Sequence, residues 1–467
     1  MKKRTGHILL YICSLTALLA IIWLVLKTGK SLEPAVATGN NPSAGHSTQL
    51  LSPIIEAFSH PLAIFILQIM LIIAASQVCS FLIRKIGQPT VMGEIIAGIL
   101  LGPSLMGAVA PQFSAFIFPV SSLGNLQMLS QVGLILFMFV IGMELDMAVL
   151  KKKASTAMLI SYFSIIIPFG MGMGLSYFLY ERFAPAGIPF YAFSLFTGIA
   201  MSITAFPVLA RIIRERGMAN TRLGTITLTS AAVGDVAAWC MLAFIIAIVK
   251  AGSVSASLYT IVAAIVYVCL MLLVVKPLLD RMAMRGAHDK TMKRSVLALI
   301  FLVLLLSSYC CEVIGIHALF GAFLAGVIMP TQWNFRTVLI GKIEDVALVL
   351  LLPLFFVYTG LRTQIGLLSD PSLWLTCSWV ILIAVAGKFG GAALAARISG
   401  EPVKESLSIG ALMNTRGLVE LVVLNIGYDL HILTAQYFTM MVLMALVTTL
   451  MTNPALNLIN RIYKENT

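Results

Sequence analysis

The chain contains about fourteen windows of predominantly apolar residues, joined by short connections. A helix rises about 1.5 Å per residue, so about twenty apolar residues span the hydrocarbon core of a bilayer. Hydrophobic residues make up 60% of the 467 positions and charged residues 11%, more apolar surface than a soluble domain buries. The sequence therefore predicts an all-α polytopic membrane protein. Its windows lie at roughly 8–27, 61–82, 90–108, 124–146, 155–180, 188–214, 222–250, 254–280, 292–314, 316–331, 338–360, 372–398, 404–428 and 434–460.

Basic residues gather at one set of span ends. If successive windows alternate in direction, every basic group falls on one side, and the positive-inside rule makes that side cytoplasmic. The net charge of +12 thus indicates how the chain is oriented in the membrane. The sequence has no stripe of basic residues interleaved with aromatic residues, so we expect no nucleic-acid partner. The groups are Lys2 to Arg4, Arg84 and Lys85, Lys151 to Lys153, Arg211 to Arg222, Arg281 to Arg294, Arg397 and Lys404, and Arg461 and Lys464.

The first window has two interpretations. Its basic start and apolar run suit a retained anchor helix, whereas the Ala-Val-Ala at 35–37 resembles a signal-peptidase site, although rather far beyond the apolar run. Either interpretation leaves the same thirteen-helix body. We expect residues 1–60 to be an anchor or signal peptide with an external linker, 61–461 a transmembrane domain, and 462–467 a short cytoplasmic tail.

Asp235 lies alone in the apolar run 228–239, near the midpoint of its window. A carboxylate at the bilayer centre costs at least about 2.5 kcal/mol and persists mainly where it lines a cavity or binds an ion. Such a group can hold either a proton or a cation. Asp235 is therefore the candidate site of proton-coupled ion exchange, with transient Na+ or K+ as its metal ion.

The window 188–214 carries polar and helix-breaking residues near its middle. Pro207 lacks an amide donor and clashes with the carbonyl four residues back, so it favours a break. Ser202 and Thr204 supply hydroxyls that could satisfy freed backbone groups or help to bind an ion. The sequence predicts a helix that is interrupted near these residues.

The window 404–428 carries a second interruption of opposite direction. Asn414, Thr415 and Gly417 favour an unwound segment, and Arg416 adds a cation at mid-membrane. Paired interruptions in opposite halves are the best sequence indication of a transporter's ion site, because half-helix ends expose unpaired amides and carbonyls. We expect the two broken helices to cross, with Arg416 compensating the negative helix ends. A proline kink with a snorkelling arginine is the alternative.

Two further charged residues lie in membrane windows. Lys388, midway along 372–398, is either an electrostatic neighbour of Asp235 or a structural lysine bonded to backbone carbonyls. Glu420 lies one turn from Arg416, so an intrahelical salt bridge is expected, and a pair across the crossing is the alternative.

The motifs, taken in order, resemble those of the monovalent cation:proton antiporters, specifically the second cation:proton antiporter family and its plant-type cation/H+ exchangers with their bacterial relatives. The resemblance covers residues from about 61 to 455. Each stretch is weak alone, and the ordered set is specific. The stretches are 93–98, 101–104, 137–146, 202–211, 231–239, 314–323, 352–356 and 413–421.

This resemblance implies a thirteen-helix inverted repeat with a core domain and a dimer domain, crossed broken helices, and homodimers that move substrate by shifting the core. It also implies that Asp235 binds the ion and proton, with Lys388 as its basic neighbour. Gly234 departs from the family pattern, because many electrogenic relatives have a second aspartate there and many electroneutral ones have Asn or Gln. A single carboxylate favours electroneutral one-for-one exchange.

The expected function is antiport of K+ or Na+ against H+, and a channel-like or ligand-gated K+ efflux protein on the same scaffold is the alternative. The expected partners are H+, a monovalent cation, the lipid bilayer and a second copy of the chain. No cofactor is expected. An enzyme is not indicated, because the sequence has no nucleophile–base set, metal cluster or phosphate-binding loop, and we assign no catalytic residue.

Overall fold

The computed structural model describes residues 60–144, 154–218, 221–251, 254–285, 293–331 and 335–463. The expected N-terminal anchor or signal peptide, and residues 464–467 of the expected tail, lie outside them. The described residues form helices and no strands. Nine of these helices are long and apolar enough to cross a membrane. The prediction of an all-α polytopic membrane protein is confirmed.

The nine long helices match nine of the thirteen windows predicted from residue 61 onward. The other windows, at 188–214, 316–331, 338–360 and 404–428, hold shorter or interrupted helices. The total of thirteen crossings therefore stays a prediction.

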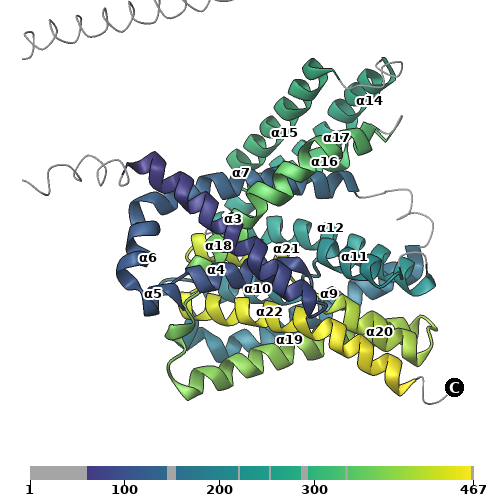
Figure 1. Ribbon diagram of the computed structural model, residues 1–467. Helices are drawn as coiled ribbons and strands as arrows, with labels where there is room; N and C mark the ends of the chain where they lie inside the picture. Colours follow the sequence, from purple (N-terminus) through teal and green to yellow (C-terminus); the bar gives the residue numbers. More distant parts are fainter. Residues whose placement is uncertain are drawn as a thin grey trace, which may run out of the picture. The chain divides into compact units, whose positions relative to one another are not determined.

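One set of helices carries all the predicted site residues, and we call it the crossing group. In it α9 packs against α10, α12 and α19, and α22 packs against α19, α20 and α21. Figure 1 shows α19, α20 and α22 along the lower part of the ribbon. The members are α9 (Ala154–Phe183), α10 (Phe190–Ser202), α11 (Phe206–Glu215), α12 (Arg222–Ala251), α19 (Pro371–Ile398), α20 (Val403–Met413), α21 (Leu418–Asp429) and α22 (Ala435–Ile462).

The remaining helices form a second group, in which α7 packs on α16 and α18, and α4 packs on α3 and α18. Small residues permit this close approach: a Cβ on Gly326 of α16 would lie 2.1 Å from the Phe139 carbonyl oxygen of α7. The members are α3 (Pro61–Lys85), α4 (Thr90–Leu101), α5 (Met106–Val109), α6 (Pro111–Ile117), α7 (Val120–Glu144), α13 (Val254–Leu270), α14 (Lys276–Arg285), α15 (Arg294–Ile314), α16 (Ala318–Val327), α17 (Phe335–Asp345), α18 (Leu352–Arg362) and the 3₁₀ turn η5 (Ile365–Leu367).

Two widened turns in the second group lie next to prolines. The π segments η2 (Met271–Val275) and η4 (Val346–Leu351) come just before Pro277 and Pro353. Proline lacks an amide donor and clashes with the carbonyl four residues back, and a π turn replaces the usual bond by one to a residue five positions away. The chain therefore stays helical through both prolines.

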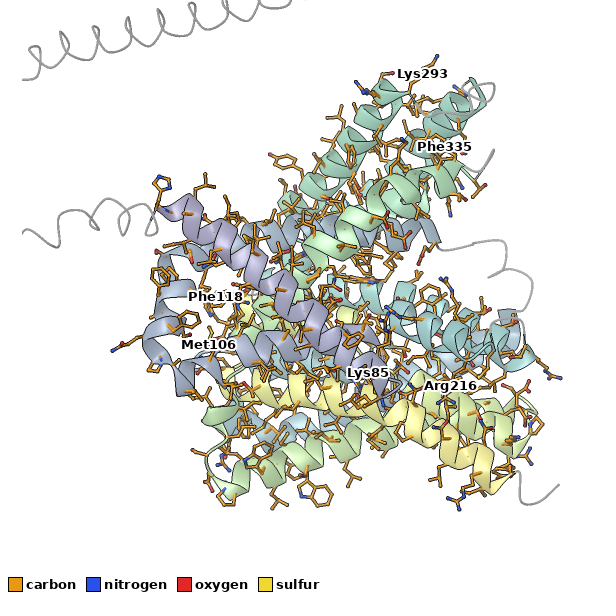
Figure 2. The ribbon with its side chains drawn as sticks, in the orientation of Figure 1. Lys85, Met106, Phe118, Arg216, Lys293 and Phe335 are labelled. Atoms are coloured by element: carbon orange, nitrogen blue, oxygen red, sulfur yellow. The ribbon has the colours of Figure 1, made fainter. Side chains whose placement is uncertain are left out.

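Five residues at or near predicted span ends can be located in Figure 2. Arg216 and Lys293 lie toward the right of the ribbon, Met106 and Phe118 toward the left, and Lys85 near the middle. Lys85, Arg216 and Lys293 belong to groups predicted to be cytoplasmic. Met106, near the end of the window 90–108, and Phe118, before the window 124–146, flank a connection predicted to be external, and this sidedness stays a prediction.

Candidate functional site

The first interruption lies between α10 and α11. Helix α10 ends at Ser202, and Ile203 (φ −73°, ψ 139°) and Ala205 (φ −82°, ψ 92°) are extended. Pro207 occupies the first turn of α11, where a helix requires no amide donor. The break predicted for this window is present, but Pro207 lies in the first turn of the second half-helix and not inside the break.

The second interruption lies between α20, which ends at Met413, and α21, which begins at Leu418. Gly417 has φ 154° and ψ −129°, a conformation that side-chain-bearing residues rarely adopt. A Cβ on Gly417 would also lie 3.0 Å from Val208 Cγ2 of α11. Glycine is therefore required here both by the backbone and by the neighbouring half-helix.

The two interruptions are hydrogen-bonded to each other, so the broken helices cross as predicted. The Ala205 amide donates to the Thr415 carbonyl oxygen at 3.1 Å, and the Thr204 hydroxyl donates to the Met413 carbonyl oxygen at 3.1 Å. Half-helix ends leave such groups without partners inside their own helix. Here groups of the first break donate hydrogen bonds to backbone carbonyls of the second break.

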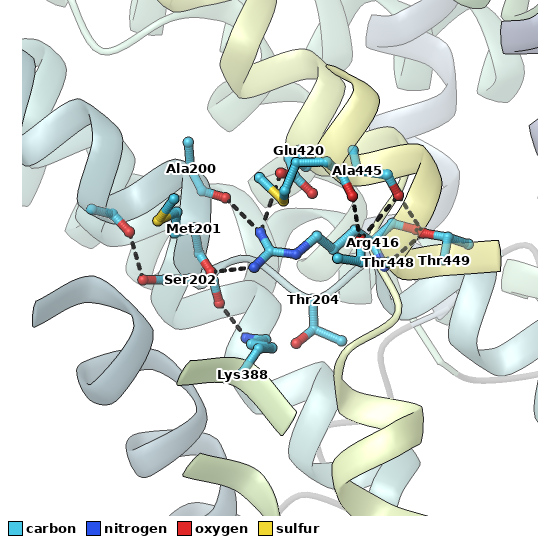
Figure 3. A network of polar contacts seen from close by, with 12 residues as sticks. Ala200, Met201, Ser202, Thr204, Lys388, Arg416, Glu420, Ala445, Thr448 and Thr449 are labelled. Carbon is cyan, nitrogen blue, oxygen red and sulfur yellow. Dashed lines mark hydrogen bonds and ion pairs between the residues drawn. The ribbon is translucent and has the colours of Figure 1, made fainter. Parts of the chain in front are cut away.

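Arg416 joins the second break to the end of α10. Its side chain is fully buried, and its guanidinium donates to the carbonyl oxygens of Ala200 (3.0 Å) and Met201 (2.8 Å), as Figure 3 shows. These carbonyls lie in the last turn of α10, where the helix dipole is negative. The same guanidinium pairs with Glu420 Oε1 at 3.2 Å, so the salt bridge expected from sequence is present. It is not intrahelical, because Arg416 lies in the break and Glu420 in α21.

Threonines of α22 support the second break, and sequence reasoning missed them. Thr449 Oγ1 accepts from the Arg416 amide at 3.0 Å and lies 2.8 Å from the Arg416 carbonyl oxygen. Thr452 Oγ1 lies 3.1 Å from Thr415 Oγ1. The available signal was the spacing of Thr449 and Thr452, which places two hydroxyls on one face of an apolar helix.

Lys388 of α19 reaches the end of the first half-helix. Its buried Nζ donates to the Ser164 carbonyl oxygen of α9 at 2.8 Å and to the Ser202 carbonyl oxygen of α10. Within the described residues it makes no salt bridge, but it interacts electrostatically with Asp235. The structure thus contains features of both interpretations of this lysine: bonds to carbonyls and an acidic neighbour.

Asp235 of α12 is 1% exposed. Neither carboxylate oxygen accepts a hydrogen bond of standard geometry from the described part of the chain. The groups that act on it electrostatically include the backbone amide of Phe206, in the first turn of α11, and the Lys388 ammonium. The carboxylate is therefore buried inside the protein, beside the first break, with unused acceptor capacity.

The other predicted ion ligands, Ser202 and Thr204, lie at the first break, and their hydroxyls are directed at backbone carbonyls. Ser202 Oγ donates to the Gly198 carbonyl oxygen at 2.7 Å and lies 3.2 Å from that of Ile165. Asn414 caps α20, and its buried Oδ1 has no hydrogen-bond partner among the described residues. The structure brings the predicted residues into one region, and their binding roles stay predictions.

A family described as sodium/hydrogen exchanger, transmembrane, matches residues 69–458. The Na(+)/H(+) antiporter NhaS4 of Synechocystis is 40% identical over 85% of this chain and 97% of that protein. The cation/H(+) antiporter 17 of Arabidopsis thaliana is 41% identical over 87% of this chain and 49% of that protein, so the chain spans about half the length of that plant relative. The K(+)/H(+) antiporter 1 of Saccharomyces cerevisiae is 32% identical over 86% of this chain and 47% of that protein.

The fold is also that of a solved transporter. The sodium proton antiporter MjNhaP1 from Methanocaldococcus jannaschii superposes with a TM-score of 0.65 over 85% of this chain and 98% of that one, at 15% identity. The family resemblance inferred from the motifs is confirmed. The broken helices and the buried acid of this chain agree with what its relatives indicate. The chain belongs to the family of transmembrane sodium/hydrogen exchangers.

Proposed function

We propose that this protein is a secondary active antiporter that exchanges Na+ or K+ for H+ through one carboxylate, that of Asp235. The observation that carries the proposal is that this carboxylate is 1% exposed, lies beside the Phe206 amide at the first break and accepts no hydrogen bond of standard geometry from the described residues. A buried acid of this kind has acceptor capacity for a proton or a cation. The names of the relatives support these substrates.

The charged residues around Asp235 support alternating occupancy of its carboxylate by a cation and a proton, because they limit the net charge of the site. Arg416 neutralises the negative end of α10 and is itself paired with Glu420. Lys388 supplies a positive neighbour when the carboxylate is empty and ionised. A bound cation or proton would take over that compensation.

In the proposed cycle, ionised Asp235 binds a partly dehydrated cation with help from oxygens of Thr204, Ser202 and the broken backbones. The crossing group then moves relative to the second group, the cation leaves, and a proton takes its place. Because cation and proton occupy one site in turn, neither flux proceeds without the other. Gly234 provides no second acid, so we propose electroneutral one-for-one exchange.

We further propose that residues 61–461 form the exchanger domain. The protein would lie in the cell membrane, with its C-terminus on the cytoplasmic side. The positive-inside distribution of Lys and Arg supports this orientation. A homodimer assembled through the second group would provide a fixed frame for movement of the crossing group. Chemical cross-linking in membranes tests the dimer.

Proton movement in proteoliposomes tests the mechanism. Protein is reconstituted with a pH-sensitive dye, a proton gradient is imposed, and Na+ or K+ is added to wild type, to Asp235→Asn and to the matched control Asp280→Asn on α14. Exchange is expected in wild type and the control and absent in Asp235→Asn. Undiminished exchange in Asp235→Asn would refute the mechanism.

A clamped membrane potential separates the alternatives. Electroneutral exchange keeps the same rate at any potential, whereas two-for-one exchange accelerates with the appropriate sign of potential. Cation flux that follows the potential without moving protons would instead identify the channel-like alternative.

A further inference from the structure

Gly234, the residue before Asp235 in α12, packs closely against a serine of another helix. A Cβ built on Gly234 would lie 3.3 Å from Ser161 Oγ of α9. Ser161 is 1% exposed, and α9 packs along α12. The hydroxyl of Ser161 therefore lies beside the backbone next to the proposed binding acid, where a longer side chain at position 234 would project.

The Ser161 hydroxyl is buried without a hydrogen-bond partner among the described residues, and so is that of Ser164 one turn along. Other buried hydroxyls in these helices donate to the carbonyl four residues back, as Thr227 does to Leu223 and Ser230 to Ile226. An unpaired buried hydroxyl is costly, and such a group in a native structure calls for an explanation.

The same face of α9 is tied to the acid through Lys388. The ammonium of Lys388 donates to the Ser164 carbonyl oxygen and interacts with Asp235. Ser161 lies three residues before Ser164, on the same side of the helix. Lys388 thus connects the segment of α9 that holds the two unpaired hydroxyls with the carboxylate of Asp235.

We propose that Ser161 Oγ is a further ligand of the transported alkali cation and occupies the place that a side chain at position 234 would otherwise fill. The inference rests on the proposed function of Asp235. Alkali cations are hard ions that bind oxygen, and a hydroxyl offers lone pairs without adding charge. A neutral ligand completes the coordination and leaves the one-for-one charge balance of a single acid unchanged.

Cation affinity tests the role of the Ser161 oxygen. Ser161→Ala removes the oxygen, and Ser161→Cys replaces it by sulfur, a poor ligand for Na+ and K+ at nearly the same volume. Both variants are expected to raise the apparent KM for the cation about three- to tenfold with little change in maximal rate. Ser194→Ala on α10 is the matched control, because that buried hydroxyl is also unpaired but lies about 12 Å from the end of its half-helix.

A binding measurement accompanies the flux assay. Na+ and K+ are titrated against thermal unfolding of the purified protein, and the concentration that gives half of the cation-dependent stabilisation is recorded. This midpoint is expected to rise by the same factor in Ser161→Ala and Ser161→Cys and to stay unchanged in Ser194→Ala.

Three results would overturn the inference. The first is a wild-type KM and midpoint in both Ser161 variants, and the second is a wild-type KM in Ser161→Cys alone, which would show that Ser161 only fills space. The third is an equal loss of affinity in Ser194→Ala. Asp235→Asn is measured alongside: intact exchange in that variant refutes the proposed function itself, whereas wild-type behaviour of Ser161 variants with an inactive Asp235→Asn refutes this inference alone.

Discussion

The buried pair formed by Arg416 and Glu420 allows a quantitative test of how the second break is held. Both side chains are fully buried and 3.2 Å apart. The substitution Arg416→Met removes the guanidinium at similar length. It leaves the Glu420 carboxylate without its cation and the carbonyls of Ala200 and Met201 without their donor.

The expected loss of stability follows from these contacts. Removing one partner of a buried ion pair costs about 3–5 kcal/mol, because the other charge stays buried and uncompensated. In the double variant Arg416→Met with Glu420→Met no unpaired charge remains, and the two carbonyls account for a loss of about 1–3 kcal/mol. The double variant should therefore be more stable than Arg416→Met alone.

Thermal unfolding in detergent measures this difference. An unfolding entropy of about 2.1 cal/mol/K per residue over 467 residues makes 3–5 kcal/mol correspond to a Tm decrease of roughly 3–5 °C. The matched control is Arg182→Met, which breaks a 3.9 Å pair with Asp370 whose side chains are 49% and 57% exposed. An exposed pair contributes only about 0–1 kcal/mol.

The reasoning would be refuted if Arg416→Met lowered Tm no more than Arg182→Met, or if the double variant were less stable than Arg416→Met. Either outcome would mean that the buried charge of Glu420 is not what makes the loss of Arg416 costly.

Two further substitutions test the geometry of the second break. Thr449→Val keeps the shape of the side chain but removes the acceptor for the Arg416 amide, and it should lower stability by about 1–3 kcal/mol in thermal unfolding. Its comparison is Thr448→Val, whose hydroxyl donates to carbonyls of α22 itself. Gly417→Ala should destabilise by about 1–3 kcal/mol, because alanine rarely adopts φ 154° and its Cβ would press on Val208. A Tm equal to that of Gly390→Ala, where a Cβ meets open space, would contradict the strain at Gly417.

Much of the architecture can be predicted from the apolar windows of the sequence and from the polar, charged, proline and glycine residues that interrupt them. Helix positions follow from hydropathy because a bilayer leaves few other ways to satisfy backbone groups. Both interruptions are visible as polar, proline or glycine residues inside such windows. The contribution of Pro207 was less clear, since the same residue suits the start of a helix as well as the end of one.

The supporting side chains were harder to predict. Thr449, Ser161 and the carbonyl of Ser164 lie on α22 and α9, far from the breaks in sequence and within otherwise apolar helices. Nothing in their local sequence indicates which helix they face. Their partners become evident only when distant half-helices pack together.

The amino-acid order alone determined that this is a membrane protein with two opposed broken helices and one isolated acid at mid-span, because transfer of apolar and charged groups into lipid depends on composition and position along a helix. The tertiary structure decided which groups meet: Arg416 on the end of α10, Lys388 between α9 and α10, and Ser161 opposite Gly234. Hydrogen bonds and ion pairs form only within about 3–4 Å, and distances that short are set by how helices cross.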